Sequence, residues 1–442
     1  MQRPLRYRGR LDRSSADPMP TAPTLFYERM PPAGVVFGCL LPVPWVGAAA
    51  GLLLALGPSA GLPDRFAPLS LALVHALVVG MLLPAMLGAL FQLLPVVAGV
   101  PVRGAKWVSP WVALSCVATA SALATGFLGA DHRAFVLAAW LGAPLLAVPA
   151  ALIILAGMRV GQTRATHATV RTLRRIGWPL LVTLASGATL GTALASGWFA
   201  PSPVLLNLHV GWGLGGWLAT LVAGVASTVL PMFWQTRRLP EPWHRLMPWW
   251  LWAPLAVGSL CSGVGGAVFW QTWGWLALAA LVGVRAVCSA RRRHDPGWRL
   301  WLAAAVAWLV VAMLGLTASW LPSDWPITWE IGALAVVGGG VLPVNAMLGK
   351  IIPFMIWMHL RRRVPRHVRL PAMQTLIGER QQHWHARLLL LVLLALLLVP
   401  LQPERMAVVA GLLFALAHVW LGAMLCRALL TFRRVSRAFA PA

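Results

Sequence analysis

Long uninterrupted runs of apolar residues dominate the chain, and short stretches rich in arginine separate them. A helix needs about 20 mainly apolar residues to cross the hydrocarbon core of a bilayer, and most of these runs reach that length. Lipid offers no hydrogen-bond partner to the backbone, so each run is predicted to be helical. The pattern predicts an all-α polytopic membrane protein. Its twelve runs lie at residues 33–57, 66–99, 107–130, 133–158, 175–198, 203–234, 247–270, 272–290, 298–321, 328–360, 386–402 and 405–430.

The arginines alternate from one loop to the next. Loops after even-numbered runs are basic, as are the arm at 1–32, the loop at 361–385 and the C-terminal tail, whereas loops after odd-numbered runs carry little positive charge. Positive charge on short loops marks the cytoplasmic side. We therefore expect both termini in the cytoplasm, a cytoplasmic basic arm (1–32), a cytoplasmic basic loop (361–385) and one transmembrane domain over 33–430.

Composition excludes several classes of protein. Of 442 residues, 59% are hydrophobic and 11% charged, which is typical of a protein that crosses a bilayer many times. We expect that bilayer to be a bacterial-type inner membrane. The net charge of +25 would suggest nucleic acid in a soluble chain, but here the arginines set topology, so we expect a lipid bilayer and no nucleic acid. The five cysteines are scattered without a CxxC, which indicates neither a disulfide framework nor a thiolate metal site.

One four-residue pattern occurs three times. Residues 92–95 (Gln-Leu-Leu-Pro), 228–231 (Thr-Val-Leu-Pro) and 350–353 (Lys-Ile-Ile-Pro) each place a polar residue and two aliphatic residues before a proline. They lie on the second, sixth and tenth runs, and an even spacing of four helices gives parallel repeats. The predicted architecture is three four-helix pseudo-repeats, 33–158, 175–290 and 298–430, around a pseudo-threefold axis.

Two histidines lie inside these runs at matched positions. His75 and His209 precede Pro95 and Pro231 by about 20 residues, which at 1.5 Å per residue places both roughly 30 Å from the prolines and at similar depth. Imidazole within a membrane is rare and usually functional, and a neutral imidazole can bind haem iron or copper. The alternative is a histidine that is hydrogen-bonded to a neighbouring helix or hydrated near the headgroups.

Other polar residues in the runs are weaker candidates. Glu330 lies at the equivalent depth of the tenth run and is either a carboxylate ligand or proton-handling group, or an ordinary first-turn acid. Lys350 either extends to the inner interface or lies on a buried polar path with Asn345, and its repeat equivalent Gln92 is also polar. His418, midway along the twelfth run, is a further possible ligand.

A second set of histidines is predicted to lie outside the helical runs. His359 is at an inner helix end, where a capping or interfacial role is expected. The remaining members are assigned to loops: His132, His167, His244, His294, His367, His383 and His385.

Together these features resemble subunit I of the haem–copper oxidases, across about residues 33–430. The likeness is greatest to oxidase-like bacterial membrane proteins related to the cbb3 type, whose tenth helix is similar to residues 350–354 (Lys-Ile-Ile-Pro-Phe) followed by Trp357 and a basic loop; the NnrS family is a more distant comparison. The resemblance implies that His75 corresponds to a ligand of the low-spin haem and His209 to one ligand of copper.

The chain departs from the oxidases at their oxygen-reducing centre. Those enzymes carry two copper-binding histidines on the seventh helix, where 247–270 has none and His244 lies outside, and two haem-binding histidines on the tenth, where only His359 occurs. We therefore expect one haem or one copper ion at most, in a protein of redox, gas (nitric oxide or oxygen) or metal handling that is not a complete oxidase. An electron-transfer or assembly partner is a further expectation.

Two alternatives remain. One is a cofactor-free transporter or permease in which Lys350, Asn345, Gln92 and the membrane histidines line a path. The other is a structural or assembly subunit that keeps the fold and has lost the metal sites.

Overall fold

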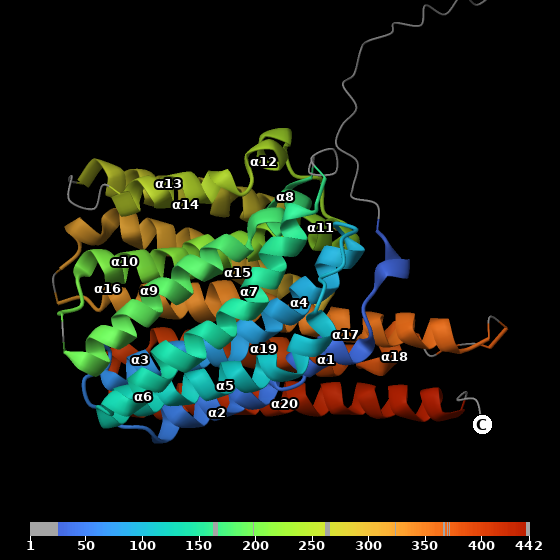
Figure 1. Cartoon of the computed structure of the whole chain (residues 1–442), viewed down its shortest axis with the longest axis horizontal. Coiled ribbons are helices and arrows are strands. Elements are labelled where there is room, and N and C mark those ends of the chain that lie inside the picture. The colour runs from blue at the N-terminus through green and yellow to red at the C-terminus, as the bar shows by residue number, and fades with distance from the viewer. Residues whose placement is uncertain are drawn as a thin grey trace, which may run out of the picture.

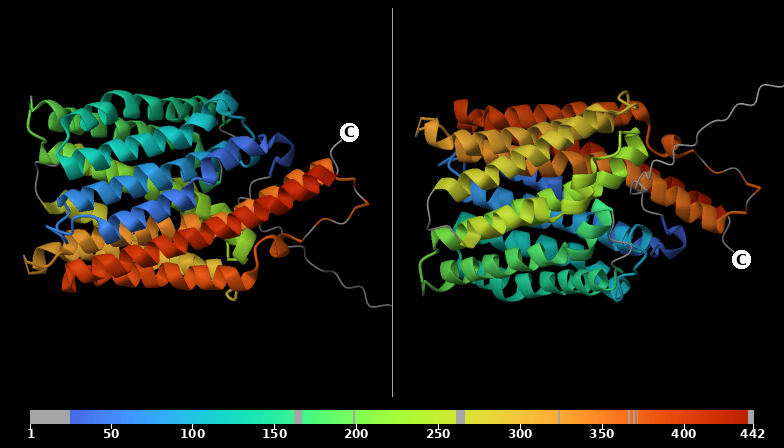
Figure 2. Two further views of the ribbon diagram at one scale, coloured as in Figure 1. Left: turned by 90° about the horizontal axis from the view of Figure 1, so that it is seen from below. Right: turned by 90° about the horizontal axis from the view of Figure 1, so that it is seen from above.

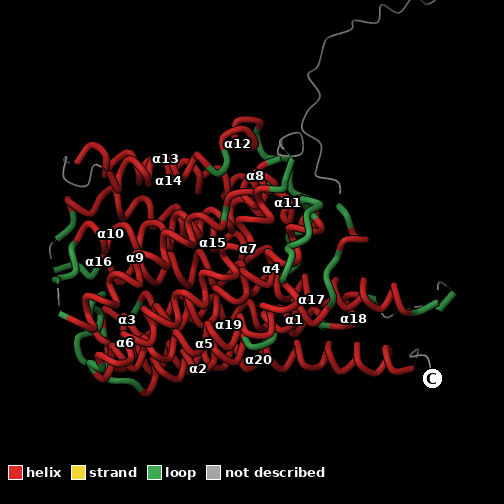
Figure 3. Tube along the Cα trace, viewed as in Figure 1, coloured by secondary structure: helices red, strands yellow, loops and turns green. Residues whose placement is uncertain are grey.

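The computed structural model describes residues 25–161, 167–197, 199–260, 266–322, 324–365, 367, 368, 370 and 372–438. Every regular element among these residues is a helix (Figures 1 and 3). Most of the helices run along one common direction in a single bundle, and the first described residues lie at the same end of that bundle as the C-terminus (Figures 1 and 2). The arm at 1–32 falls mostly outside the described residues.

Ten helices in the described part of the chain are long and apolar enough to cross a membrane, which makes the protein a multi-pass membrane protein. Each matches one of the predicted runs, with ends that differ by up to eight residues. These spans are Ala33–Leu56, Pro68–Val96, Ala105–Gly129, His132–Met158, Ala168–Ser196, Pro203–Trp234, Pro296–Trp320, Ile327–Arg362, Glu379–Leu401 and Pro403–Ala438.

The seventh and eighth predicted runs are not among these ten. They correspond to α13 (Trp249–Leu260) and α14 (Gly266–Cys288), which pack against each other. The boundary between them falls on residues 261–265, outside the described residues. The twelve-helix count therefore stays a prediction.

Two stretches expected as loops are partly helical. Arg171, Arg174 and Arg175 belong to α8 (Ala168–Arg175), which directly precedes α9 (Gly177–Ser196). Within 361–385, α17 continues to Arg363 and α19 (Glu379–Leu397) begins before the apolar run, with the short α18 (Met373–Leu376) between them. Helices extend beyond the apolar stretch because a basic turn still forms its backbone hydrogen bonds in water. The remaining short elements are η1 (Tyr27–Arg29), α12 (Glu241–Leu246), η6 (Ala318–Trp320) and η8 (Val399–Leu401).

Three spans share an unusual interior, in which a π-helical segment interrupts the α-helix. The segments are η2 (Ala76–Leu82), η5 (Gly211–Ala219) and η7 (Ala333–Val341), and each begins about 20 residues before Pro95, Pro231 or Pro353. A π-helical segment is rare and is frequent at functional sites; a fourth, η3 (Ala138–Gly142), interrupts the span that continues as α7 (Ala143–Met158). The flanking α-helices are α3 (Pro68–His75) and α4 (Leu83–Val96), α10 (Pro203–Val210) and α11 (Thr220–Trp234), and α16 (Ile327–Gly332) and α17 (Leu342–Arg363).

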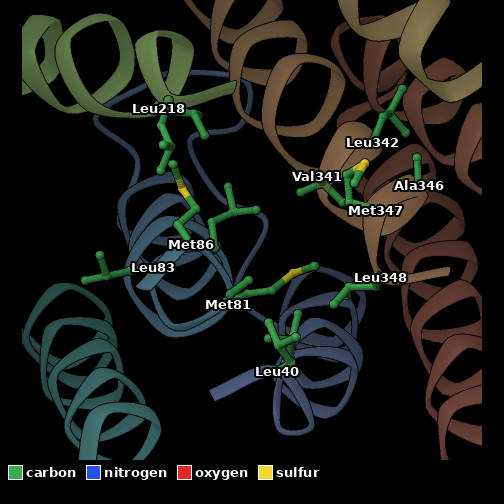
Figure 4. Close-up of a cluster of buried hydrophobic side chains, with 14 of the residues drawn as sticks. Leu40, Met81, Leu83, Met86, Leu218, Val341, Leu342, Ala346, Met347 and Leu348 are labelled. Carbon is green, nitrogen blue, oxygen red and sulfur yellow. The ribbon is translucent and has the colours of Figure 1, made fainter. Parts of the chain in front are cut away.

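These three interrupted helices meet at Gly340 in the core. A Cβ atom added there would lie 3.0 Å from Leu82 Cδ1 and 3.1 Å from Leu218 Cδ2, so the absent side chain lets η7 approach both neighbours. Around this point Met86, Leu218 and Met347 form part of the apolar core (Figure 4). The helices that carry the predicted repeat are thus in mutual contact.

The first and last spans pack closely, through small residues. In α2 (Val43–Leu56), a Cβ on Gly51 would lie 2.5 Å from the backbone nitrogen of Ala415, and one on Gly411 of α20 (Pro403–Ala438) would lie 2.5 Å from the Gly51 oxygen. Small residues four apart allow such contact between membrane helices. Together with α1 (Ala33–Leu40), α5 (Ala105–Gly129) and α15 (Pro296–Thr317), they pack against the three interrupted helices. The short α6 (His132–Leu137) packs against α5 and α9.

Candidate functional site

The structure brings His75 and His209 together. His75 ends α3 and His209 is the second-last residue of α10, each just before a π-helical segment. Their ring centroids are 6.3 Å apart and their planes differ by 16°. Both side chains are half-buried. Residues 134 positions apart in the chain therefore form one imidazole pair between two spans.

Hydrogen bonds fix the proton on each ring. His75 Nδ1 is 2.8 Å from the Leu71 carbonyl oxygen, and His209 Nδ1 is 3.1 Å from the Thr183 carbonyl oxygen. A carbonyl only accepts, so Nδ1 carries the hydrogen in both rings and Nε2 of the neutral imidazole carries the lone pair. Metal-binding histidines have this arrangement, in which the second nitrogen donates to a carbonyl.

Close packing holds the pair in place. A Cβ on Gly187 of α9 would lie 2.8 Å from His209 Cε1, so this ring occupies space that any larger residue would take. Phe127 of α5 packs against His75 with centroids 5.2 Å apart, and Phe135 packs against Phe127 at 5.1 Å. The aromatic rings make the His75 side of the pair apolar.

Glu330 does not complete a metal cluster with these histidines. It lies in the first turn of α16 and is half-buried. Within the described residues, no group of three or more His, Cys, Asp or Glu side chains is arranged to hold a metal ion. Among the described residues, His75 and His209 are thus a pair without a third side chain of these four types.

Lys350 is paired with an acid that the sequence did not single out. Its ammonium group donates to Asp295, and the two side chains are mostly buried. Asp295 also accepts from the Gly297 backbone N–H at 2.9 Å, as the N-cap of α15, and from the Trp234 indole at 3.2 Å. Lys350 thus ties α17 to the N-terminal end of α15.

Gln92 and Asn345 are buried with incomplete hydrogen bonding. Asn345 is 1% exposed and donates through Nδ2 to the Val341 carbonyl at 2.8 Å. Its Oδ1 atom and the Oε1 atom of Gln92 are buried and have no hydrogen-bond partner among the described residues. Leaving a buried polar atom unpaired costs about 1–3 kcal/mol, so these two positions are candidates for contact with a ligand.

His418 has a neighbour that the sequence placed in a loop. His385 is in α19, not in a loop, and is buried, as is His418 in α20. The two imidazoles are close enough to interact electrostatically, and each Nε2 is buried without a hydrogen-bond partner in the described structure. His418 Nδ1 donates to the Phe414 carbonyl at 2.9 Å, and its ring lies against Gly47. The hydropathy pattern placed His385 in a loop because the apolar run begins only at residue 386, whereas α19 begins at Glu379.

A third pair of histidines lies outside the spans, where loops were expected. His167 caps α8 and His244 is in α12, with centroids 4.5 Å apart. His167 Nδ1 accepts the Thr169 N–H at 3.4 Å, and His244 Nδ1 accepts the Ala168 N–H at 3.3 Å. Burial, helped by His244 and Arg238, lowers the pKa of His167 to about 4, and burial also lowers the pKa of His244. Both are neutral near pH 7 and act in helix capping.

No protein-family model matches this chain, and no curated protein matches its sequence. The functional assignment therefore depends on the chemistry of the residues themselves.

Proposed function

We propose that His75 and His209 hold a single haem iron or copper ion inside the membrane, in a protein of redox, gas or metal handling. The observation that carries this proposal is the geometry of the two imidazoles. Two imidazoles that would hold one ion have to lie close together, and each has to keep its Nε2 lone pair free of a proton. The observed centroid distance is 6.3 Å.

The donor set fits these two groups and not a structural zinc site. Zinc in such sites takes four protein ligands, whereas the described residues provide no group of three. Haem iron takes axial imidazoles from the protein, and imidazole also suits copper. When bound, either group would supply one-electron transfer or binding of a small gas.

The protein's own residues prepare the pair for this role. The carbonyls of Leu71 and Thr183 hold the Nδ1–H tautomer, which leaves the Nε2 lone pairs available. Gly187 leaves space for His209, and Phe127 shields His75. These contacts set ring orientation and restrict water, which raises the basicity of the ligating nitrogens.

The positions of the other histidines argue against oxygen reduction. His244, the histidine nearest to the seventh predicted run, accepts the Ala168 N–H at the start of α8, and His359 is buried near the end of α17. We propose one centre, at the His75–His209 pair, in a protein that is not a complete terminal oxidase.

We also infer the finer architecture. The matched π-helical segments and the meeting of Leu82, Leu218 and Gly340 support three pseudo-repeats around one axis. The alternating loop charges support twelve spans with both termini in the cytoplasm. In this proposal the histidine pair lies toward the outer face of a bacterial-type inner membrane, and an electron-transfer or assembly partner acts with it.

The test is purification of the full chain from its own host, followed by visible spectroscopy and metal analysis. A Soret band, or about one copper per chain, is expected, and His75→Ala should remove it. A folded preparation supplied with haem and copper that shows neither would contradict the proposal.

That result would favour a cofactor-free transporter. The buried, incompletely hydrogen-bonded Gln92 and Asn345 and the Lys350–Asp295 ion pair are the observations behind this second candidate.

A further inference from the structure

A cavity of about 130 Å³ lies between the inner halves of the three interrupted helices. Side chains of α4, α11 and α17 form most of its wall, and Val36 and Leu40 of α1 close one side. Met86 and Leu40, seen in Figure 4, are on this wall. No charged side chain belongs to the part of the lining that the structure describes.

The N-terminal segment covers one end of this cavity. Leu25 and Tyr27 line it, and Tyr27 packs against Phe354 of α17 with ring centroids 6.1 Å apart. The Phe26 N–H donates to the Val96 carbonyl at 2.7 Å, and Arg362 donates to the Tyr27 carbonyl. These contacts fasten the segment across the helix ends.

Two polar side chains in the lining lack partners. Gln92 is 7% exposed, and its Oε1 makes no hydrogen bond to any described residue. Trp301 of α15 is 5% exposed, and its indole Nε1 likewise has no described partner. Two further polar side chains belong to the described lining: Thr228, which is already bonded to Thr169 at 2.8 Å, and Tyr27 of the N-terminal segment. The mainly apolar lining thus includes one residue with an unpaired acceptor atom, Gln92, and one with an unpaired donor atom, Trp301.

We propose that this cavity binds an uncharged, mainly hydrocarbon ring that carries one hydroxyl group, with the hydroxyl at the Gln92 amide. An ion is disfavoured, because burying a charge without a partner is costly. The volume is close to that of engineered apolar cavities of about 150 Å³ that bind benzene. A hydroxyl both donates and accepts, so it satisfies an acceptor such as Gln92 Oε1 and a donor such as Trp301 Nε1.

The test compares two rings of nearly equal shape, para-fluorophenol and para-fluorotoluene, by fluorine NMR on the purified full chain in nanodiscs. The quantity measured is the ratio of their dissociation constants in the wild type and in Gln92→Met. Partition of each ring into lipid and hydration of the hydroxyl are the same for the wild type and the variant, so they do not affect the change in this ratio. Loss of one hydrogen bond should reduce the preference for the phenol roughly three- to tenfold.

A second variant tests the location. Ala89 lines the cavity, and Ala89→Phe should weaken binding of both rings at least about tenfold by filling the space. Ala49→Phe, at an exposed position of α2, adds the same bulk elsewhere and should leave binding unchanged. Thermal unfolding of each variant establishes that it is folded. Undiminished binding to folded Ala89→Phe, or an unchanged ratio in folded Gln92→Met, would overturn the proposal.

Discussion

Two histidine pairs in this protein use the same side chain in opposite ways. In the His75–His209 pair, Nδ1 of each ring donates to a carbonyl, whereas in the His167–His244 pair Nδ1 of each ring accepts a backbone N–H. The first arrangement leaves Nε2 as a lone pair available to a metal; the second uses the Nδ1 lone pair to complete a helix end. Ring proximity therefore does not identify a metal site, and the direction of the hydrogen bond at Nδ1 distinguishes the proposed ligand pair from the capping pair.

The largest difference between the pairs is expected in bound metal. His209→Gln removes one lone pair from the membrane pair and should lower haem or copper content at least about tenfold, since second-shell changes alone cost 10–100-fold in metal affinity. His167→Gln removes one imidazole from the capping pair and should leave metal content unchanged. Metal analysis and absorbance of both purified variants check this. Equal loss in both would show that the two pairs do not differ in the way proposed.

Lowering the pH should destabilise the fold through the His167–His244 pair. Burial lowers the folded-state pKa of His167 to about 4, from an ordinary value near 6.5, and that of His244 is also lowered. At pH 7 both states are neutral; as pH falls from about 6.5 to 4, the unfolded chain binds protons that the folded chain does not, so stability falls with pH. His167→Asn keeps a capping acceptor and removes the titrating group.

Thermal unfolding between pH 7 and pH 4 measures this effect. The variant should lose less stability than the wild type over that range, by on the order of 2 kcal/mol, and should match it near pH 7. His132→Asn, at an exposed histidine, serves as the control. A variant with the wild-type pH slope would show that His167 accepts a proton in the folded state.

The hydropathy pattern predicted the ten described spans closely because lipid allows only helices across the membrane. The count of residues before Pro95 and Pro231 matched His75 with His209 in depth, and the observed pair agrees because both helices carry a π-helical segment at the same place. The segments themselves have no simple composition signal. Equally, nothing in the sequence linked Lys350 to Asp295, 55 residues away, because such pairing depends on how α15 and α17 pack.

The smallest expected effect on metal affinity at the His75–His209 pair comes from substitution of Ser186. Its hydroxyl donates to the Val182 carbonyl at 2.8 Å, so the contact of 3.4 Å to His209 Nδ1 is one in which the serine oxygen accepts. The Thr183 carbonyl, at 3.1 Å, is the nearer acceptor for the same N–H. Ser186→Ala should therefore leave the tautomer intact and lower metal affinity only about twofold, as expected when a long, shared hydrogen bond is lost.

Nitrogen-15 NMR of His209 in the metal-free protein reads the tautomer directly, and metal titration gives the affinity. Ser227→Ala is the control away from the pair, at a buried serine whose hydroxyl donates to the Ala223 carbonyl at 3.2 Å and accepts the Trp243 indole N–H at 2.9 Å. If Ser186→Ala instead moved the proton to Nε2 or cost more than about tenfold in affinity, Ser186 and not the Thr183 carbonyl would orient His209. The contrast between the two histidine pairs would then depend on a side chain and not on the backbone.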